Sequence, residues 1–189
     1  MKNEIEESLT ESIKLRTELL SDSVETIIQI ANISVDAFKS GHSLYLMGNG
    51  GSAADAQHIS GELVGRFKKD RKPLPAFALT TNTSVLTAIA NDYGYDQCFE
   101  KQVEAFVKDG DVVFGLSTSG NSTSIINAIV SAGKKGAKTI AFTGKDGGRL
   151  KELVDVCLTI PSSDTARIQE CHITIGHILC SIIEKELFE

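Results

Sequence analysis

The sequence predicts an α/β fold, a three-layer sandwich in which helices flank a five-stranded parallel sheet, with an N-terminal helical extension. Short apolar runs recur from residue 43 onward, and each is followed by a glycine- or serine-containing loop and a helix-like stretch. Apolar side chains occupy both faces of these runs, as expected of strands that are covered on both sides. A chain of 189 residues is long enough for one such domain and too short for a second full catalytic domain.

Residues 1–40 are predicted to form two helices, because apolar side chains recur at spacings of three and four residues in two successive stretches. The break is expected at residues 21–23, where Asp22 and Glu25 resemble a capping box, and Gly41 is the expected stop of the second helix. The first helix carries only a narrow apolar stripe, which needs a partner surface. We therefore expect this segment to serve oligomerisation through Ile5, Leu9 and Ile13.

Five strands and a long C-terminal helix complete the predicted fold. The last helix is expected from about Ala166 to Leu187, because Pro161 and four polar residues precede a long segment with apolar side chains at helical spacing. No internal repeat interrupts the chain, so residues 1–189 are expected to form a single domain. The strands are expected at residues 44–47, 76–79, 112–116, 139–142 and 156–160.

Charge and composition exclude several classes of function. The chain has 19 Lys and Arg against 25 Asp and Glu, a net charge of −6, and it lacks a long basic run, which argues against nucleic-acid binding. No window resembles a transmembrane segment, and the acidic N-terminal sequence lacks the apolar stretch of a signal peptide, so we expect a cytoplasmic protein without a membrane partner. The four cysteines form no CxxC motif and are expected to be reduced core thiols.

Two loops after predicted strands have the composition of anion sites. Residues 48–52 (Gly-Asn-Gly-Gly-Ser) follow the first strand, and residues 117–122 (Ser-Thr-Ser-Gly-Asn-Ser) follow the third. Ligands of open α/β sheets bind at the carboxyl ends of strands, where backbone N–H groups at helix starts favour anions. The second loop is the better phosphate cradle because its hydroxyls can donate hydrogen bonds. The alternative is that both loops are ordinary helix N-caps, since neither matches a Walker A or GxGxxG motif.

Four side chains are of types that bind metal ions. His58 and Glu62 are four residues apart and share one helix face, so they form either half of a divalent metal site or a solvated surface pair. Gln169 and His177 lie on the last helix, about 80° apart around its axis and about 12 Å apart along it. Both reach one ion only if they approach from opposite ends or belong to different subunits. His172, among apolar neighbours, is expected to be a core histidine.

A third polar segment, residues 91–95, follows the helical run 84–90 and is polar enough to be a loop. Asp92 in this segment could bind the hydroxyl groups of a sugar. The alternative is that the segment is the C-terminal turn of the preceding helix.

These motifs occur together in a known family. Residues 47–58 and 61–67, with 91–95, 117–122 and 167–177, resemble the phosphoheptose isomerases of the sugar isomerase (SIS) superfamily. The resemblance covers essentially the whole chain, and its ordered motifs are jointly specific.

The resemblance implies the SIS fold and a homotetramer with one zinc ion per subunit and active sites near subunit interfaces. The zinc ligands that it implies are His58, Glu62, Gln169 and His177. The implied ligand is a sugar phosphate, bound by Asn49, Gly50, Gly51, Ser52, Glu62, Arg66, Asn91, Asp92, Ser117, Thr118, Ser119, Ser122 and Gln169.

The implied reaction is the aldose–ketose isomerisation of D-sedoheptulose 7-phosphate to D-glycero-D-manno-heptose 7-phosphate through an enediol. It would be the first step of nucleotide-activated heptose synthesis for a surface polysaccharide such as lipopolysaccharide. Such a reaction needs a base for a carbon-bound proton and a group that stabilises oxygen charge. We expect Glu62 to carry the proton, His177 to act as the second acid/base, and zinc to act as a Lewis acid.

Two alternatives remain at this point. The chain could be a non-catalytic SIS module that binds a sugar phosphate or a replication-initiation partner, but the presence of both Glu62 and His177 favours an enzyme. It could also isomerise another sugar phosphate, such as arabinose 5-phosphate or a hexulose 6-phosphate. The absence of appended regulatory domains argues against the former of these substrates.

Overall fold

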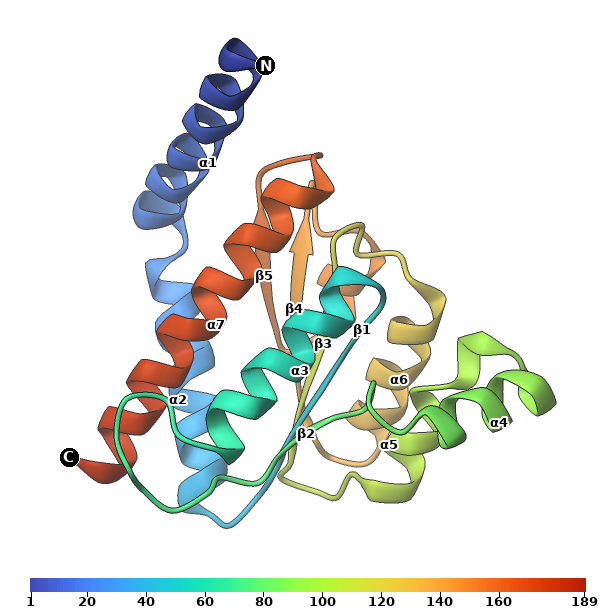
Figure 1. The fold of residues 1–189 in the computed structure, drawn as a ribbon. Coiled ribbons are helices and arrows are strands. Elements are labelled where there is room, and N and C mark those ends of the chain that lie inside the picture. The colour runs from blue at the N-terminus through green and yellow to red at the C-terminus, as the bar shows by residue number, and fades with distance from the viewer.

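The computed structural model describes all 189 residues and places a parallel sheet between two helical layers (Figure 1). The strand order is β2-β1-β3-β4-β5, and every neighbouring pair is parallel. The predicted fold class and all five strands are confirmed, with bounds that differ by two residues at most. The strands are β1 (Leu44–Gly48), β2 (Ala76–Ala78), β3 (Val112–Ser117), β4 (Lys138–Gly144) and β5 (Val156–Ile160).

Seven α-helices and two short 3₁₀ segments, Tyr95–Gln97 and Arg149–Glu152, connect and cover the strands. None of the helices combines the length and apolar character needed to cross a bilayer. The helices are α1 (Lys2–Asp22), α2 (Val24–Lys39), α3 (Gly51–Val64), α4 (Thr83–Tyr93), α5 (Glu100–Phe106), α6 (Thr123–Lys134) and α7 (Thr165–Phe188).

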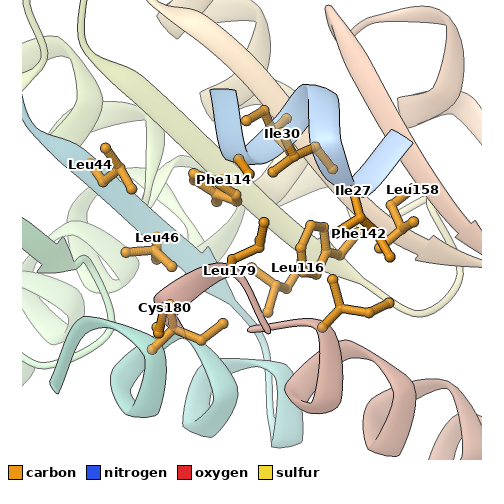
Figure 2. Packing of buried hydrophobic residues seen from close by; sticks show 14 of the residues in the cluster. Ile27, Ile30, Leu44, Leu46, Phe114, Leu116, Phe142, Leu158, Leu179 and Cys180 are labelled. Atoms are coloured by element: carbon orange, nitrogen blue, oxygen red, sulfur yellow. The ribbon is translucent and has the colours of Figure 1, made fainter. Parts of the chain in front are cut away.

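The core consists of two apolar clusters, one on each face of the sheet. Alternation along β1 shows the division, because Leu44 and Leu46 belong to the cluster under α2, α3 and α7, whereas Tyr45 and Met47 belong to the cluster under α5 and α6. Figure 2 shows the first cluster, where side chains of α2 and α7 meet those of the central strands. Burial on both faces explains why the central strands β1, β3 and β4 read as continuous apolar runs in the sequence, whereas the edge strands β2 and β5 are less fully buried.

The N-terminal helix α1 extends away from the sheet (Figure 1). Leu15 and Leu19 of α1 are buried within the chain. The predicted apolar stripe is not, since Ile5 and Leu9 are each 59% exposed and Ile13 is 67% exposed. This stripe therefore has no covering surface within its own chain.

Of the local predictions about helix ends, one is wrong and two are confirmed. The capping box does not form, because Asp22 is the last residue of α1 and the N-cap of α2 is Ser23, whose side chain makes no capping hydrogen bond. For residues 91–95 the C-terminal turn of the preceding helix is confirmed, because α4 continues through Tyr93 and stops at Gly94, where φ is +92°. The expected stop at Gly41 is confirmed, with φ of +80° directly after the cap of α2.

The remaining helix and cysteine predictions are confirmed. The C-terminal helix begins at Thr165, where the Asp164 carboxylate accepts hydrogen bonds from the backbone N–H of Ala166 at 2.7 Å and of Arg167 at 3.3 Å. All four cysteines are free thiols; Cys98, Cys171 and Cys180 are buried as expected of core residues, and Cys157 is partly buried.

Candidate active site

The strand order reverses between β1 and β3, because the chain leaves β1 toward β2 on one side and reaches β3 on the other. Gly48 at the end of β1 is in register with Leu116 of β3. The loop 48–52 and the serine loop, residues 117–122, therefore leave the same edge of the sheet side by side. Ligands of open α/β sheets bind at such a reversal point.

Glycines shape the first of these loops. Gly50 is the N-cap of α3 and has φ of +58°, a conformation that other residues adopt at a cost. A β-carbon at Gly51 would lie 2.6 Å from the amide nitrogen of Gln169, so the missing side chain gives Gln169 its place beside α3. Ser52, in the first turn of α3, is buried.

Asn49 joins this loop to two other segments. Its Nδ2 donates to Ser124 Oγ on α6 at 3.1 Å, and its Oδ1 accepts from the Tyr95 hydroxyl at 2.6 Å. Burial, with a smaller contribution from Cys98, raises the pKa of Tyr95, so this hydroxyl is protonated and donates at neutral pH. Sequence reasoning missed this contact, because the pairing of positions 49 and 95 depends on where the 3₁₀ segment Tyr95–Gln97 comes to rest against α6.

The serine loop is held in place by internal hydrogen bonds and by a neighbouring loop. Ser117 Oγ and Ser122 Oγ are 3.0 Å apart, and Ser119 Oγ accepts from the backbone N–H of Asn121 at 3.1 Å. The Gly120 carbonyl accepts from the backbone N–H of Leu150 at 3.0 Å. Because α6 begins directly after Ser122, the positive end of its dipole lies at this loop, as an anion site requires.

His58, Glu62 and His177 form a cluster between α3 and α7. His58 Nε2 lies 3.1 Å from Glu62 Oε1 and 3.1 Å from His177 Nε2. One donor atom from each of the three side chains lies within 4.8 Å of the others. The His58 side chain is 48% exposed and that of Glu62 is 26% exposed, so the cluster is open to solvent in the single chain.

The donor types of the cluster and two of its three spacings are compatible with a tetrahedral metal ion. Zinc–ligand bonds of about 2.0–2.1 Å place the ligand atoms of a tetrahedral site about 3.3 Å apart. The two 3.1 Å distances around His58 Nε2 are close to this spacing. Imidazole and carboxylate are also a donor set that zinc accepts.

A half-buried carboxylate stands one turn before His58. Asp55 Oδ2 is buried without a hydrogen-bond partner. Burial raises the pKa of Asp55 to about 6, and the nearby His58 opposes this rise. Sequence spacing gave no sign of this group, because its burial depends on how α3 packs in the folded chain.

An aromatic contact to the cluster was also missed from the sequence. The ring of Phe67, in the segment after α3, stacks on the ring of His177 with a centroid distance of 5.9 Å and an interplanar angle of 22°. Residues 65–67 belong to the motif that resembles the isomerase family, but no spacing rule connects position 67 to position 177.

The other predicted residues are placed apart from the cluster. Gln169 lies beside Gly51, two turns before His177 on α7. Arg66 is exposed and forms no hydrogen bond or ion pair within the chain. Asn91 donates to Asp92 Oδ1 at 2.8 Å at the exposed end of α4. Their predicted contacts with a substrate or an ion stay predictions.

A cavity of about 680 Å³ lies elsewhere, lined by β2, α5 and the segments before β1 and β3. Tyr45, Phe77 and Phe106 form its apolar wall, and His42 and Asp111 lie at its polar rim. It contains none of the predicted site residues. The catalytic hypothesis therefore rests on the chemistry of the loops and the cluster rather than on the size of this cavity.

Comparison with known proteins decides the family. Residues 9–144 match the model of the SIS domain. The chain is 55% identical to a phosphoheptose isomerase of Clostridium acetobutylicum, over 100% of this chain and 97% of that protein. The chain belongs to the phosphoheptose isomerase family. It is also 49% identical to the Aquifex aeolicus member, over 100% of this chain and 99% of that protein.

The solved structures agree with this membership. A phosphoheptose isomerase from Neisseria gonorrhoeae superposes with a TM-score of 0.93 at 42% identity, over 97% of this chain and 98% of that chain. The resemblance inferred from the motifs and the SIS fold are thereby confirmed. As a member of the phosphoheptose isomerase family, the chain is an isomerase.

Proposed function

We propose that this protein interconverts D-sedoheptulose 7-phosphate and D-glycero-D-manno-heptose 7-phosphate, supplying the first intermediate of nucleotide-activated heptose synthesis for a surface polysaccharide. The observation that carries the proposal is the cluster of Glu62, His58 and His177. Glu62 Oε1 and His177 Nε2 each lie 3.1 Å from His58 Nε2. A carboxylate and an imidazole side by side supply the two proton carriers that an enediol reaction needs.

The substrate phosphate is assigned to the serine loop. Ser117, Thr118, Ser119 and Ser122 offer hydroxyl donors at the start of α6, and charge-assisted hydrogen bonds to a phosphate are the stronger kind. Asn49 is held by two hydrogen bonds and presents the glycine loop, with Gly50, Gly51 and Ser52, to the sugar. The roles proposed for Arg66, Asn91, Asp92 and Gln169 are further contacts with the sugar phosphate.

The proton transfer is assigned to Glu62 and His177. Glu62 takes the proton from carbon 1 of the ketose and returns it to carbon 2, which moves the carbonyl group from carbon 2 to carbon 1. His177 exchanges the hydroxyl protons as oxygen charge develops in the enediol. Phe67 fixes the plane of the His177 ring for this task.

We propose zinc as the resident metal ion, with His58, Glu62, Gln169 and His177 as its ligands. The three clustered donors support this ligand set, whereas the place of Gln169 beside Gly51 leaves open from which subunit it binds. When bound, zinc would supply Lewis-acid polarisation of the substrate oxygens. Glu62 then has two roles, and its carboxylate must leave one of them during turnover.

We propose that residues 1–40 are an oligomerisation segment and that the active protein is a homotetramer. The exposed stripe of Ile5, Leu9 and Ile13 supports a covering subunit. The exposure of His58 supports an active site near a subunit interface, because a second copy would shield the cluster from water.

The test is incubation of the purified protein with D-sedoheptulose 7-phosphate in D₂O, followed by NMR. We expect new aldose signals, with deuterium at carbon 2 of the product from exchange at the base. Arabinose 5-phosphate and a hexulose 6-phosphate serve as comparison substrates, and we expect slower conversion of both. Saturable binding of the heptulose phosphate without conversion or exchange would instead identify a non-catalytic sugar-phosphate module.

A further inference from the structure

A buried ion pair joins the segment after α3 to the end of α7. Arg71 Nε lies 3.3 Å from Glu184 Oε2, and the two side chains are 2% and 4% exposed. The Glu184 carboxylate also accepts from the backbone N–H of Phe67 at 3.3 Å, of Lys68 at 3.0 Å and of Lys69 at 3.1 Å. Burial alone would raise the pKa of Glu184, but these four hydrogen-bond donors hold it below its ordinary value.

The guanidinium of Arg71 closes the end of α3. Its Nη2 donates to the Glu62 carbonyl at 2.9 Å, and its Nη1 donates to the carbonyls of Leu63 at 2.7 Å and Gly65 at 3.1 Å. The last carbonyls of a helix lack partners within the helix and need such donors. One side chain therefore fixes the backbone of Glu62 and the start of the next segment together.

The segment held by this pair carries Phe67, whose ring stacks on His177. His177 lies two turns before Glu184 on α7, so the carboxylate and the imidazole face the same segment from one helix. The ion pair thus has a short physical connection to both proposed proton carriers. It reaches Glu62 through the Glu62 backbone and His177 through Phe67.

We infer that Arg71 and Glu184 are positioning residues of the isomerase site, acting through Phe67 and the end of α3 to hold His177 and Glu62 in their relative orientation. This inference deepens the proposed function and rests on it for its catalytic consequence. Neither residue touches the reacting atoms. Their effect is to set the relative orientation of Glu62 and His177.

The chain contains a matched control. Lys69 and Glu189 also pair the segment after α3 with the end of α7, but their side chains are 47% and 42% exposed. Exposed ion pairs contribute little to the stability of a protein. The Lys69 side chain also donates to no carbonyl of a helix. Lys69→Ala therefore removes an ion pair between the same two segments without touching the backbone of Glu62 or the ring of Phe67.

The first measurement monitors the environment of the His177 ring and does not depend on catalytic activity. The ring signals of His177 are recorded by NMR of the full-length protein at fixed zinc content and assigned through His177→Gln. Phe67→Leu defines the signal position without stacking. We expect Arg71→Lys and Glu184→Gln to move the His177 signals at least halfway to that position and Lys69→Ala to leave them unchanged. Unchanged signals in folded Arg71→Lys and Glu184→Gln proteins would overturn the inference.

The second measurement reads catalysis. A misplacement of about 1 Å costs up to about 100-fold in rate, so we expect kcat to fall at least about tenfold in Arg71→Lys, Glu184→Gln and Phe67→Leu, with KM changed less than about threefold. Phe67→Tyr keeps the stacked ring and should restore kcat. Equal losses in Phe67→Tyr and Phe67→Leu would contradict the role of the ring. A wild-type protein inactive on the heptulose phosphate would reject the proposed function, whereas the NMR comparison would still decide the positioning role.

Discussion

Glu62 meets more demands than any other residue of the proposed site. Its carboxylate lies 3.1 Å from His58 Nε2, and its backbone carbonyl accepts from Arg71 at 2.9 Å. The backbone of Glu62 is thus fixed, while its side chain stays 26% exposed. A carboxylate that a substrate can reach suits the proton transfer proposed for Glu62.

Glu62→Gln tests this assignment. The amide keeps the shape of the side chain but cannot act as a base at neutral pH, so kcat should fall by about 10²–10⁴-fold, as is typical of general-base loss. Zinc content is measured beside the rate, because the change also weakens a proposed ligand. Glu104→Gln, at an exposed position of α5, is the control. If Glu62→Gln retains zinc and exchanges the substrate hydrogen at the wild-type rate, the base is another residue, and His177 is tested next.

His172 shows the opposite environment for an imidazole. It is fully buried, and its Nε2 donates to the Thr143 carbonyl at 3.0 Å. Burial, only partly opposed by this hydrogen bond, lowers the pKa of His172 to about 4. The expectation of a core histidine is therefore confirmed. Because protonation of this buried imidazole is unfavourable in the folded chain, His172 lowers the stability of the fold in acid.

The pH dependence follows from this pKa. The His172 imidazole takes up a proton near pH 6.5 in the unfolded chain but only near pH 4 in the folded chain. The stability contributed by neutral His172 is therefore fully present above pH 6.5, and the free energy of unfolding decreases as the pH falls from 6.5 toward 4. Between pH 7 and pH 5 the loss should be about 2 kcal/mol. Urea unfolding of wild type and His172→Gln at both pH values measures it, and the pH effect should shrink by this amount in the variant. An equal pH effect in both proteins would contradict the assignment.

The residues of the site differ in how far the sequence could predict them. His58 and Glu62 follow from a helix period, and the loops follow from their place after apolar runs. Phe67, Tyr95 and Asp55 could not be predicted this way. Their contacts depend on where the segment after α3, the end of α4 and the buried face of α3 come to rest, which is decided by packing between elements distant in sequence.

At the scale of elements, the apolar runs predicted the strands, whereas the polar runs did not distinguish a loop from an exposed helix end. The central strands β1, β3 and β4 are buried on both faces and therefore appear in the sequence as short continuous apolar runs. The polar residues Asn91 and Asp92 are compatible with either a loop or an exposed helix end, and the φ of +92° at Gly94 ends α4 only after them. The expected capping box failed for a similar reason, since α1 continues through Asp22 and leaves Ser23 as the cap.

Contact between two loops at the carboxyl edge gives a prediction for Gly120. This residue has φ of +65°, and a β-carbon there would collide with the backbone carbonyl of Gly147. Gly120→Ala should therefore displace the serine loop, raise KM for the sugar phosphate and lower Tm, because the left-handed conformation alone costs about 1–2 kcal/mol. Gly133→Ala in α6 meets no neighbour and should raise Tm slightly. Unchanged KM in Gly120→Ala would show that the loop contact does not shape the phosphate site.

At the scale of the whole molecule, most of α1 has no covering surface within its own chain. Only Ser12, Leu15 and Leu19 of the helix are buried, and the stripe of Ile5, Leu9 and Ile13 is exposed. Deleting residues 1–20 should therefore give smaller assemblies or aggregates by light scattering, while the body of the fold keeps its circular dichroism signal. An unchanged tetramer after deletion would refute the proposed role of this segment.

The first turns of α1 gain little stabilisation from the rest of their chain. Most helical stability in proteins comes from packing of an apolar face, but the stripe of Ile5, Leu9 and Ile13 is exposed, and the side-chain hydrogen bonds that join residues 1–13 to α7 are those of Ser8 with Arg167 and of Ser12 with Glu170. A newly synthesised chain should therefore finish its sheet and flanking helices while this segment is still fluctuating, and the segment should become ordered only as copies meet. The helix content of the N-terminal segment should then depend on protein concentration. Dilution should unwind α1 before it affects the sheet and its flanking helices.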